Sequence, residues 1–250
     1  MDKEKLKELA DSEKYISGIY NYCDRWCEKC SFVDKCLSYE MSKNSIDNKT
    51  IVTDKKFWVD LENSFRIVKD MLDDYMKEHN ISYPSTEEKD YIESEMKMIE
   101  KLVKADPILM DAQIYNRTAT QILNDNDQFD SKQSTSNDDN SNSIIIAQKE
   151  AIEVINYYKS LIFVKISRAL HSHYSKDEHN FDGYEEDKLI SARIAVIAVE
   201  RSMTAWHFIF ENFKTSSDAI IDILLLLNNI KTKLEKLIPQ VIAYKRPYFD

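Results

Sequence analysis

Only two glycines and four prolines occur in the 250 residues of this chain, and this scarcity constrains the fold more than any other feature. Tight turns depend on glycine and proline, because one residue type adopts positive φ angles and the other fixes φ. A chain with so few of them has few places at which to reverse direction, which favours long helices. We therefore expect an all-α protein, and strand signals are weak throughout.

Apolar residues recur at steps of three and four along most of the chain, which is the period of an amphipathic helix. The pattern predicts a bundle of about seven helices. Four clustered cysteines add a predicted metal site near the N-terminus. The predicted divisions are an N-terminal helix and cysteine site in 1–41, three helices in 54–123, a polar loop in 124–143, three long core helices in 144–238 and a C-terminal tail in 239–250.

Helix boundaries in the first half come from capping signals. Ser85 followed by Glu88 is a capping box, and Asp106 followed by Pro107 is an N-cap with a first-turn proline. The periodic apolar residues give the faces that we expect to be buried. These are Phe57, Leu61, Phe65, Val68, Leu72 and Tyr75 in one helix, Tyr91, Ile92, Met96, Ile99, Leu102 and Val103 in the next, and Ile108, Ala112, Tyr115, Ala119 and Ile122 in the third.

In the second half, the run LISARIAVIAVERSMTAW from Leu189 is apolar nearly all round. Helices of this kind have neighbours on every side, so this one is predicted to be the hub of the bundle. The preceding stretch 124–143 is almost wholly polar and cannot bury enough surface to offset the entropy of ordering. It is predicted to be a flexible loop.

The net charge of -10 disfavours nucleic acid as a partner, since nonspecific binding to phosphates depends on a basic surface. No run of eighteen apolar residues occurs, so no membrane partner is expected. The charged start MDKEKLKELADSEK has no apolar signal core, which predicts a cytoplasmic, reducing environment. The abundance of Asn, Lys, Ile and Asp favours a bacterial source with an AT-rich genome. The expected partner is another protein or a second copy of the chain.

All four cysteines lie in the stretch YCDRWCEKCSFVDKC, as Cys23, Cys27, Cys30 and Cys36. Clustered thiolates are what soft metals and iron–sulfur clusters require, so these four are the predicted ligands. If the helix that starts near Leu6 continued this far, the first three cysteines would share one face. Only one C-x2-C pair is present, whereas structural zinc sites commonly use two, and this favours an iron–sulfur cluster over zinc. Buried cysteines used as small apolar residues, or a disulfide, remain the alternatives.

The segment CEKCSFVDKC, from Cys27 to Cys36, resembles the C-x2-C-x5-C element of iron–sulfur PD-(D/E)xK exonucleases, which also has a central aromatic residue. It is similar to the auxiliary-cluster motifs of radical-SAM maturases as well. In those families the cysteines bind a [4Fe–4S] cluster, so the resemblance implies that Cys27, Cys30 and Cys36 are three of its ligands. The wider stretch YNYCDRWCEKC is similar to segments of bacterial proteins, a likeness that implies no mechanism.

The chain departs from the nuclease pattern in two ways. The family takes its fourth cysteine from far upstream, whereas Cys23 lies only four residues before Cys27. The family also carries its carboxylates on a sheet, and here the one internal E-x-K, from Glu95 to Lys97, lies in a helical period. Nuclease activity is therefore not carried over. The cluster is expected to be structural, with a possible redox or sensing role.

The predicted hub helix also carries polar residues that could form a catalytic site. At 100° per residue, Arg193, Glu200, His207 and Glu211 fall on one stripe, which could be an active site, a buried ion-pair network or a solvent-facing strip. RSMTAWH, from Arg201 to His207, fits the R-x4-6-H pattern of HEPN-type helical ribonucleases, which gives an alternative function using Arg201 and His207. A third alternative is an interaction module with a structural four-cysteine zinc site.

Overall fold

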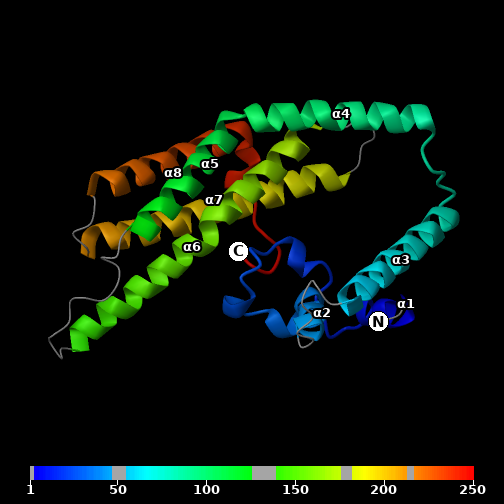
Figure 1. Cartoon of the computed structure of the whole chain (residues 1–250), viewed down its shortest axis with the longest axis horizontal. Helices are drawn as coiled ribbons and strands as arrows, with labels where there is room; N and C mark the ends of the chain where they lie inside the picture. Colours follow the sequence, from blue (N-terminus) through cyan, green and yellow to red (C-terminus); the bar gives the residue numbers. More distant parts are fainter. Residues whose placement is uncertain (1–2, 47–54, 126–138, 176–181, 213–216) are drawn as a thin grey trace. The chain divides into compact units, whose positions relative to one another are not determined.

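A computed structural model describes residues 3–46, 55–125, 139–175, 182–212 and 217–250 of the chain, shown in Figure 1. The predicted all-α class is confirmed, because the residues described form eight α-helices, several short 3-10 turns and no strand. The chain divides into two compact units, Met1–Glu93 and Ser94–Asp250. Nowhere in the described ranges is a helix both long and apolar enough to span a bilayer.

The N-terminal unit contains short elements followed by one long helix. Helix α1 spans Lys3–Ala10, α2 spans Leu37–Ile46 and α3 spans Lys55–Glu78. Between α1 and α2 the chain makes three 3-10 turns, η1 (Ile19–Asn21), η2 (Cys27–Lys29) and η3 (Val33–Lys35). Among the described residues of this unit, only Ile19 and Trp26 have buried side chains.

The first helix does not continue into the cysteines, so the condition for the first three cysteines to share one helical face is not met. Helix α1 ends at Ala10, and Gly18 has a left-handed backbone with a φ of 68°, which no α-helix accommodates. The intervening residues Asp11 and Ser12 lie in a turn, where Ser12 Oγ accepts a hydrogen bond from the Lys14 N–H at 3.3 Å. Side chains of this type compete with the helix for backbone hydrogen bonds. Helix α2 was not predicted, and with it the described residues contain eight helices where about seven were expected.

Helix α4 spans Thr86–Ala105 and begins as its capping signal predicted. The Ser85 N–H donates to Glu88 Oε2 at 2.7 Å, and the Glu88 N–H donates to Ser85 Oγ at 3.2 Å. The predicted buried face of α4 is confirmed only for Ile99 and Val103, whereas the predicted inward residues Tyr91, Ile92, Met96 and Leu102 are exposed.

The predicted buried face of α3 is wrong for most of its residues. Phe65 has 67% of its surface exposed, and Val68, Leu72 and Tyr75 are exposed as well. Helix α3 still has the expected amphipathic pattern, but its apolar side is not covered within the described chain. A periodic pattern identifies the apolar side of a helix without identifying what packs on it.

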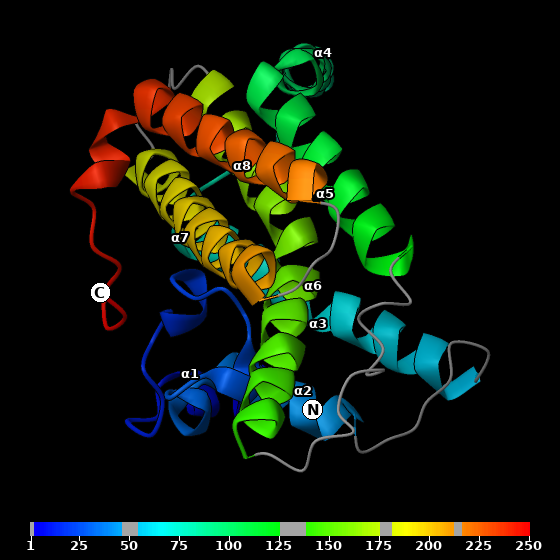
Figure 2. The ribbon, with the colours of Figure 1, turned by 90° about the vertical axis from the view of Figure 1, so that its left-hand side faces the viewer.

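The described residues of the C-terminal unit form four packed helices, preceded by residues 94–105 of α4. Helices α5 (Pro107–Asp125), α6 (Asp139–Tyr174), α7 (Asp182–Asn212) and α8 (Ser217–Leu237) pack in the cyclic order α5, α6, α7, α8, and η5 (Pro239–Ile242) follows α8. Figure 2 shows α8 in orange with α5 and α7 beside it. Of the predicted polar loop 124–143, residues 126–138 lie outside the described residues, and 139–143 belong to α6.

The core of this unit follows the sequence prediction closely. Every predicted inward residue of α5 is buried, from Ile108 to Ile122, and α7 has buried residues on several sides, as expected of a hub. Near its centre, Trp206 Nε1 of α7 donates a hydrogen bond to the Tyr115 hydroxyl of α5 at 3.3 Å. Burial raises the pKa of Tyr115 to about 12. The Asp106 carboxylate caps α5 by accepting the Ile108 N–H at 2.7 Å.

Candidate functional site

The four cysteines all lie in one compact, irregular segment between α1 and α2. Cys23 follows η1, Cys27 opens η2, Cys30 directly follows η2, and Cys36 directly follows η3. All four side chains are half-buried free thiols. The Ile16 N–H donates to the Lys35 carbonyl oxygen at 3.0 Å, a bond that brings the two ends of the segment together.

Two of the cysteines follow turns that repeat one another in sequence and in geometry. The pentapeptides WCEKC and FVDKC share an aromatic first residue, an acid, a lysine and a final cysteine. In the first, the Cys30 N–H donates to the Cys27 carbonyl at 3.2 Å, and in the second the Cys36 N–H donates to the Val33 carbonyl at 3.3 Å. Cys30 and Cys36 then both adopt extended backbones, with φ of -89° and -109°. The repeat gives two cysteines the same local setting, six residues apart.

Two of the sulfur atoms accept hydrogen bonds from the main chain. The Phe32 N–H donates to Cys30 Sγ at 3.4 Å, and the Arg25 N–H donates to Cys23 Sγ. In each case the donor lies two residues after the cysteine. Arg25 has a φ of 63°, and a non-glycine residue in the left-handed region costs about 1 to 2 kcal/mol. Such donors stabilise sulfur that carries negative charge, and in cluster proteins hydrogen bonds to sulfur help set the potential.

Two of the four thiols, Cys23 and Cys27, have a raised pKa in this conformation. Burial raises the pKa of Cys23, and the Arg25 N–H offsets part of that rise. Burial also raises the pKa of Cys27, with further contributions from the nearby charges of Cys23, Cys36 and Cys30. The Cys23 thiol donates a hydrogen bond to the Tyr20 carbonyl oxygen at 3.5 Å. The three other sulfurs are thus close enough to Cys27 to act on it electrostatically.

The four side chains do not converge on a single point. In the ranges that the structure describes, no three histidine, cysteine or acidic side chains stand close enough together to hold a metal ion. The donor set still fits a thiolate-bound metal, because the segment supplies four free thiols and directs main-chain N–H groups at two of them. Metal ligation needs deprotonated sulfur, and burial opposes deprotonation at Cys23 and Cys27 by raising the pKa of each.

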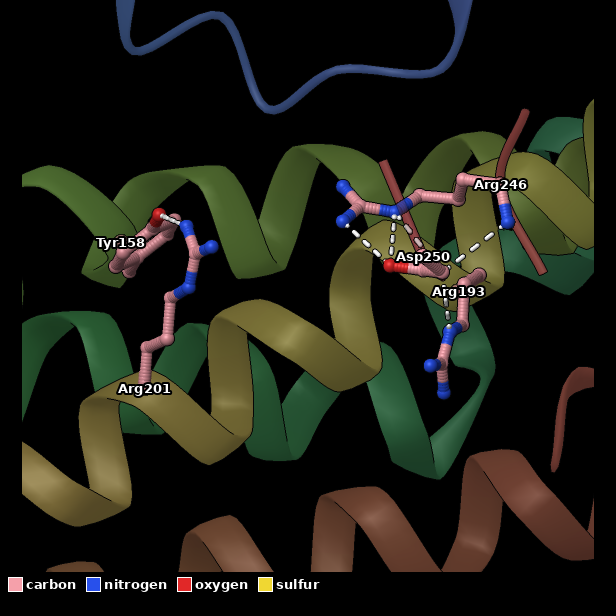
Figure 3. Close-up of polar contacts among 5 residues, drawn as sticks. All are labelled: Tyr158, Arg193, Arg201, Arg246 and Asp250. Atoms are coloured by element: carbon pink, nitrogen blue, oxygen red, sulfur yellow. Dashed lines mark hydrogen bonds and ion pairs between the residues drawn. The ribbon is translucent and has the colours of Figure 1, made fainter. Parts of the chain in front are cut away.

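Two separate polar groups include residues of α7, the helix on which catalytic candidates were expected, and Figure 3 shows both. Arg193 Nε donates to Asp250 Oδ2 at 3.3 Å, and Arg246 donates to the same carboxylate through its backbone and its guanidinium group. Arg201 donates to the Tyr158 hydroxyl. The contact between Arg193 and Asp250 has no signal in the sequence, because the two residues lie 57 positions apart.

The other candidates on α7, Glu200, His207 and Glu211, have exposed side chains. Glu200 pairs with Lys231 of α8 at 2.5 Å, and His207 Nε2 lies 3.1 Å from Glu211 Oε1 on the next turn. The His207 side chain is 62% exposed. Arg201 and His207 therefore have different partners, and no described contact joins them. The use of these residues in ribonuclease chemistry stays a prediction.

The turns that precede Cys30 and Cys36 do have a signal in the sequence. The six-residue repeat WCEKC and FVDKC is visible without a structure, and two aromatic-led repeats ending in cysteine are better matched to two turns than to one helical face. The hydrogen bonds from Arg25 and Phe32 to sulfur have no comparable signal, because they depend on backbone angles. No protein-family model, curated protein or solved structure matches the chain.

Proposed function

We propose that this protein binds a metal cofactor through the thiolates of Cys23, Cys27, Cys30 and Cys36, and that the cofactor is a [4Fe–4S] cluster. The observation that carries the proposal is that one short segment holds four free thiols and two main-chain N–H groups that donate to sulfur. Buried cysteines that serve only as apolar packing need no such donors, because a neutral thiol is a weak acceptor. This argues for sulfur that becomes charged.

An iron–sulfur cluster is favoured over zinc by the arrangement of the turns. Only Cys27 and Cys30 form the C-x2-C pair that structural zinc sites use twice. The other two cysteines lie on separate turns at either end of the segment, an arrangement suited to enclosing an object larger than one ion. Binding requires the four side chains to turn inward and lose their protons, so the Cys23 bond to the Tyr20 carbonyl must break.

The primary role that we infer for the cofactor is structural. Among the described residues of the N-terminal unit, only Ile19 and Trp26 are buried, which is a small apolar core for a segment of this length. Structural metal sites contribute apparent binding energies of about 10 to 16 kcal/mol, as much as the whole stability of an ordinary domain. A bound cluster supplies one-electron chemistry as well, which allows a redox or sensing role.

The surroundings of the sulfurs suit a negatively charged cofactor. The positive charge of Arg25 acts on Cys23 and lowers its pKa, and Lys29 and Lys35 directly precede Cys30 and Cys36 in the sequence. Four thiolates carry four negative charges, and nearby cations lower the cost of bringing them together. A cytoplasmic location accompanies this proposal, because free thiols persist in reducing compartments.

The test is a visible absorption spectrum of anaerobically purified protein, with iron, sulfide and zinc analysis of the same sample. We expect a broad band near roughly 400 nm that bleaches with dithionite, together with stoichiometric iron and sulfide. Cys30→Ser should remove the band, whereas Ser31→Ala should retain it as the matched control. One zinc per chain in colourless protein would identify the alternative, a structural zinc site. Absence of any bound metal, after anaerobic reconstitution with iron and sulfide, would refute the proposal.

A further inference from the structure

Helix α3 carries a continuous apolar stripe with the spacing of a coiled coil. The residues Trp58, Leu61, Phe65, Val68, Leu72 and Tyr75 follow one another at steps of 3, 4, 3, 4 and 3. This is the a and d pattern of a heptad repeat, with Trp58, Phe65 and Leu72 at a and the others at d. We call these six residues the α3 seam.

No side chain of the described part of the N-terminal unit covers the α3 seam. Trp58, Phe65, Val68, Leu72 and Tyr75 are all at least half exposed, and Leu61 is half-buried. Single exposed apolar residues are normal on protein surfaces, but a continuous row of this length marks an interaction site. Three of the six are aromatic, and aromatic residues are enriched at protein interfaces.

Contacts within the N-terminal unit leave the seam open. Lys3 of α1 pairs with Asp74, and the Tyr83 hydroxyl donates to Asp73. At 100° per residue, Asp73 and Asp74 lie roughly 110° to 150° around the helix from the midline of the seam. The polar contacts that attach α3 to neighbouring segments are therefore on its opposite side.

We propose that the seam binds the same seam of a second copy of the chain, forming an antiparallel two-helix coiled coil. In the antiparallel arrangement each a residue meets a d residue of the other copy. The register that uses all six positions pairs Trp58 with Tyr75, Leu61 with Leu72, and Phe65 with Val68. Each of these pairs occurs twice because the dimer has two-fold symmetry.

The charges beside the seam select this orientation. Glu62 and Lys69 occupy e positions, and both side chains are exposed. In an antiparallel coiled coil the e positions of the two helices face each other, so Glu62 of each copy meets Lys69 of the other. In a parallel coiled coil, e positions face g positions, and Glu62 and Lys69 would instead meet Phe57 and Ser64. Two complementary ion pairs form only in the antiparallel arrangement.

The size of the seam predicts a reversible dimer. An aromatic side chain buries about 150 to 250 Å² when fully covered. Each copy contributes three half-exposed rings, so the six rings of the dimer bury about 600 Å² on association. Aliphatic and flanking atoms bring the total buried area to about 1,000 Å². This lies at the low end of specific interfaces, where association is weak. We expect a dissociation constant of about 1 to 100 µM.

The test is sedimentation equilibrium of the full chain across that concentration range, under anaerobic reducing conditions that prevent intermolecular disulfides. Wild type should shift from monomer to dimer, and Phe65→Glu should weaken dimerisation at least tenfold. Asn63→Glu adds the same charge on the opposite side of α3, where Asn63 Oδ1 already accepts from Arg66 at 2.9 Å, and it should dimerise like wild type. Circular dichroism of both variants verifies that helix content is unchanged.

A charge reversal tests the orientation. Glu62→Lys should weaken the dimer severalfold because it places two lysines opposite each other, and the double variant Glu62→Lys with Lys69→Glu should restore it. In a parallel dimer Glu62 and Lys69 do not face each other, so adding Lys69→Glu to Glu62→Lys would not restore dimerisation. A wild-type protein that stays monomeric up to about 100 µM, or a Phe65→Glu variant that dimerises like wild type, would overturn the proposal.

Discussion

Helices α3 and α5 have the same kind of apolar stripe, yet the two stripes end in opposite environments. In α5 the predicted inward residues Ala112, Tyr115 and Ala119 are fully buried against α6 and α8. In α3 the corresponding residues, such as Phe65 and Val68, face solvent. The period of a sequence therefore determines which side of a helix is apolar, while the partner of that side depends on residues distant in the chain.

The two units also differ in how many apolar side chains they bury. The C-terminal unit has a large apolar core shared by four helices, whereas only Ile19 and Trp26 are buried among the described residues of the N-terminal unit. The N-terminal unit instead carries the cysteine segment and the α3 seam. We interpret this as stability obtained from a cofactor and a second copy, in place of the hydrophobic core on which the C-terminal unit depends.

The largest expected effect is the loss of the cofactor. In the double variant Cys27→Ser with Cys30→Ser, the N-terminal unit should lose about 10 kcal/mol of stabilisation from metal binding. Trypsin should then cleave after Lys29 and Lys35 at least tenfold faster than in wild type. Ser31→Ala is the matched control and should be cleaved like wild type. Equal cleavage of the double variant and wild type would contradict a structural role for the cofactor.

A large core substitution should affect only the C-terminal unit. Trp206 is fully buried and donates a hydrogen bond to Tyr115, so Trp206→Ala should destabilise this unit by about 3 to 5 kcal/mol. The cost comes from lost apolar contact, the cavity that remains and a hydroxyl without its donor. Denaturant unfolding followed by circular dichroism measures it, while the absorbance of the cofactor reports the N-terminal unit. A change in the free energy of unfolding below about 1 kcal/mol would show that the side chain of Trp206 is not tightly packed in this core.

Acid should weaken the C-terminal unit through Asp250. Burial alone raises the pKa of this carboxyl, but the hydrogen bonds from Arg246, together with Arg193, overcome that effect and lower it to about 2. A lowered pKa in the folded protein gives stability that is present above the ordinary value of 3.8 and is lost as the pH falls toward 2. The expected loss is about 2 kcal/mol.

Thermal unfolding between pH 5 and pH 2 tests this expectation, with Asp250→Asn as the comparison. The variant should be less stable than wild type at pH 5, and the difference should shrink as the pH approaches 2. A difference that stays constant with pH would mean that the carboxylate charge does not contribute. Because Arg246 is only 6% exposed, its ion pair with Asp250 should contribute more to the free energy of unfolding than a surface ion pair would.

The smallest effect should come from the α3 seam in the monomer. Phe65→Ala should change the free energy of unfolding by less than about 0.5 kcal/mol at protein concentrations below 1 µM, because the ring is already in solvent. Chemical denaturation at low concentration, read by tryptophan fluorescence, measures it. A loss of 2 kcal/mol or more would mean that the ring is buried within the monomer, and the contrast between α3 and α5 would disappear.

The sequence allowed much of the fold to be predicted and less of the site. The caps at Ser85 and Asp106 and the inward face of α5 were correct, because capping and periodicity are local properties. The condition that the first helix extends through Cys23 and Cys27 is not met, because α1 ends at Ala10, before the turn-forming residues Asp11, Ser12 and Gly18, although the apolar stripe continues beyond them. The contact of Asp250 with Arg193 could not be predicted, since it joins residues 57 positions apart without a repeating pattern.

The most direct test of a structural role for the proposed cofactor is hydrogen exchange of the full chain. The exchange is compared between cofactor-loaded protein and protein stripped by a chelator. We expect residues 11–36 to lose protection by at least tenfold on stripping, while buried amides of α5 and α7 remain unchanged as the internal reference. Equal protection of residues 11–36 in both samples would contradict the claim that a cofactor, in place of an apolar core, holds the N-terminal unit together.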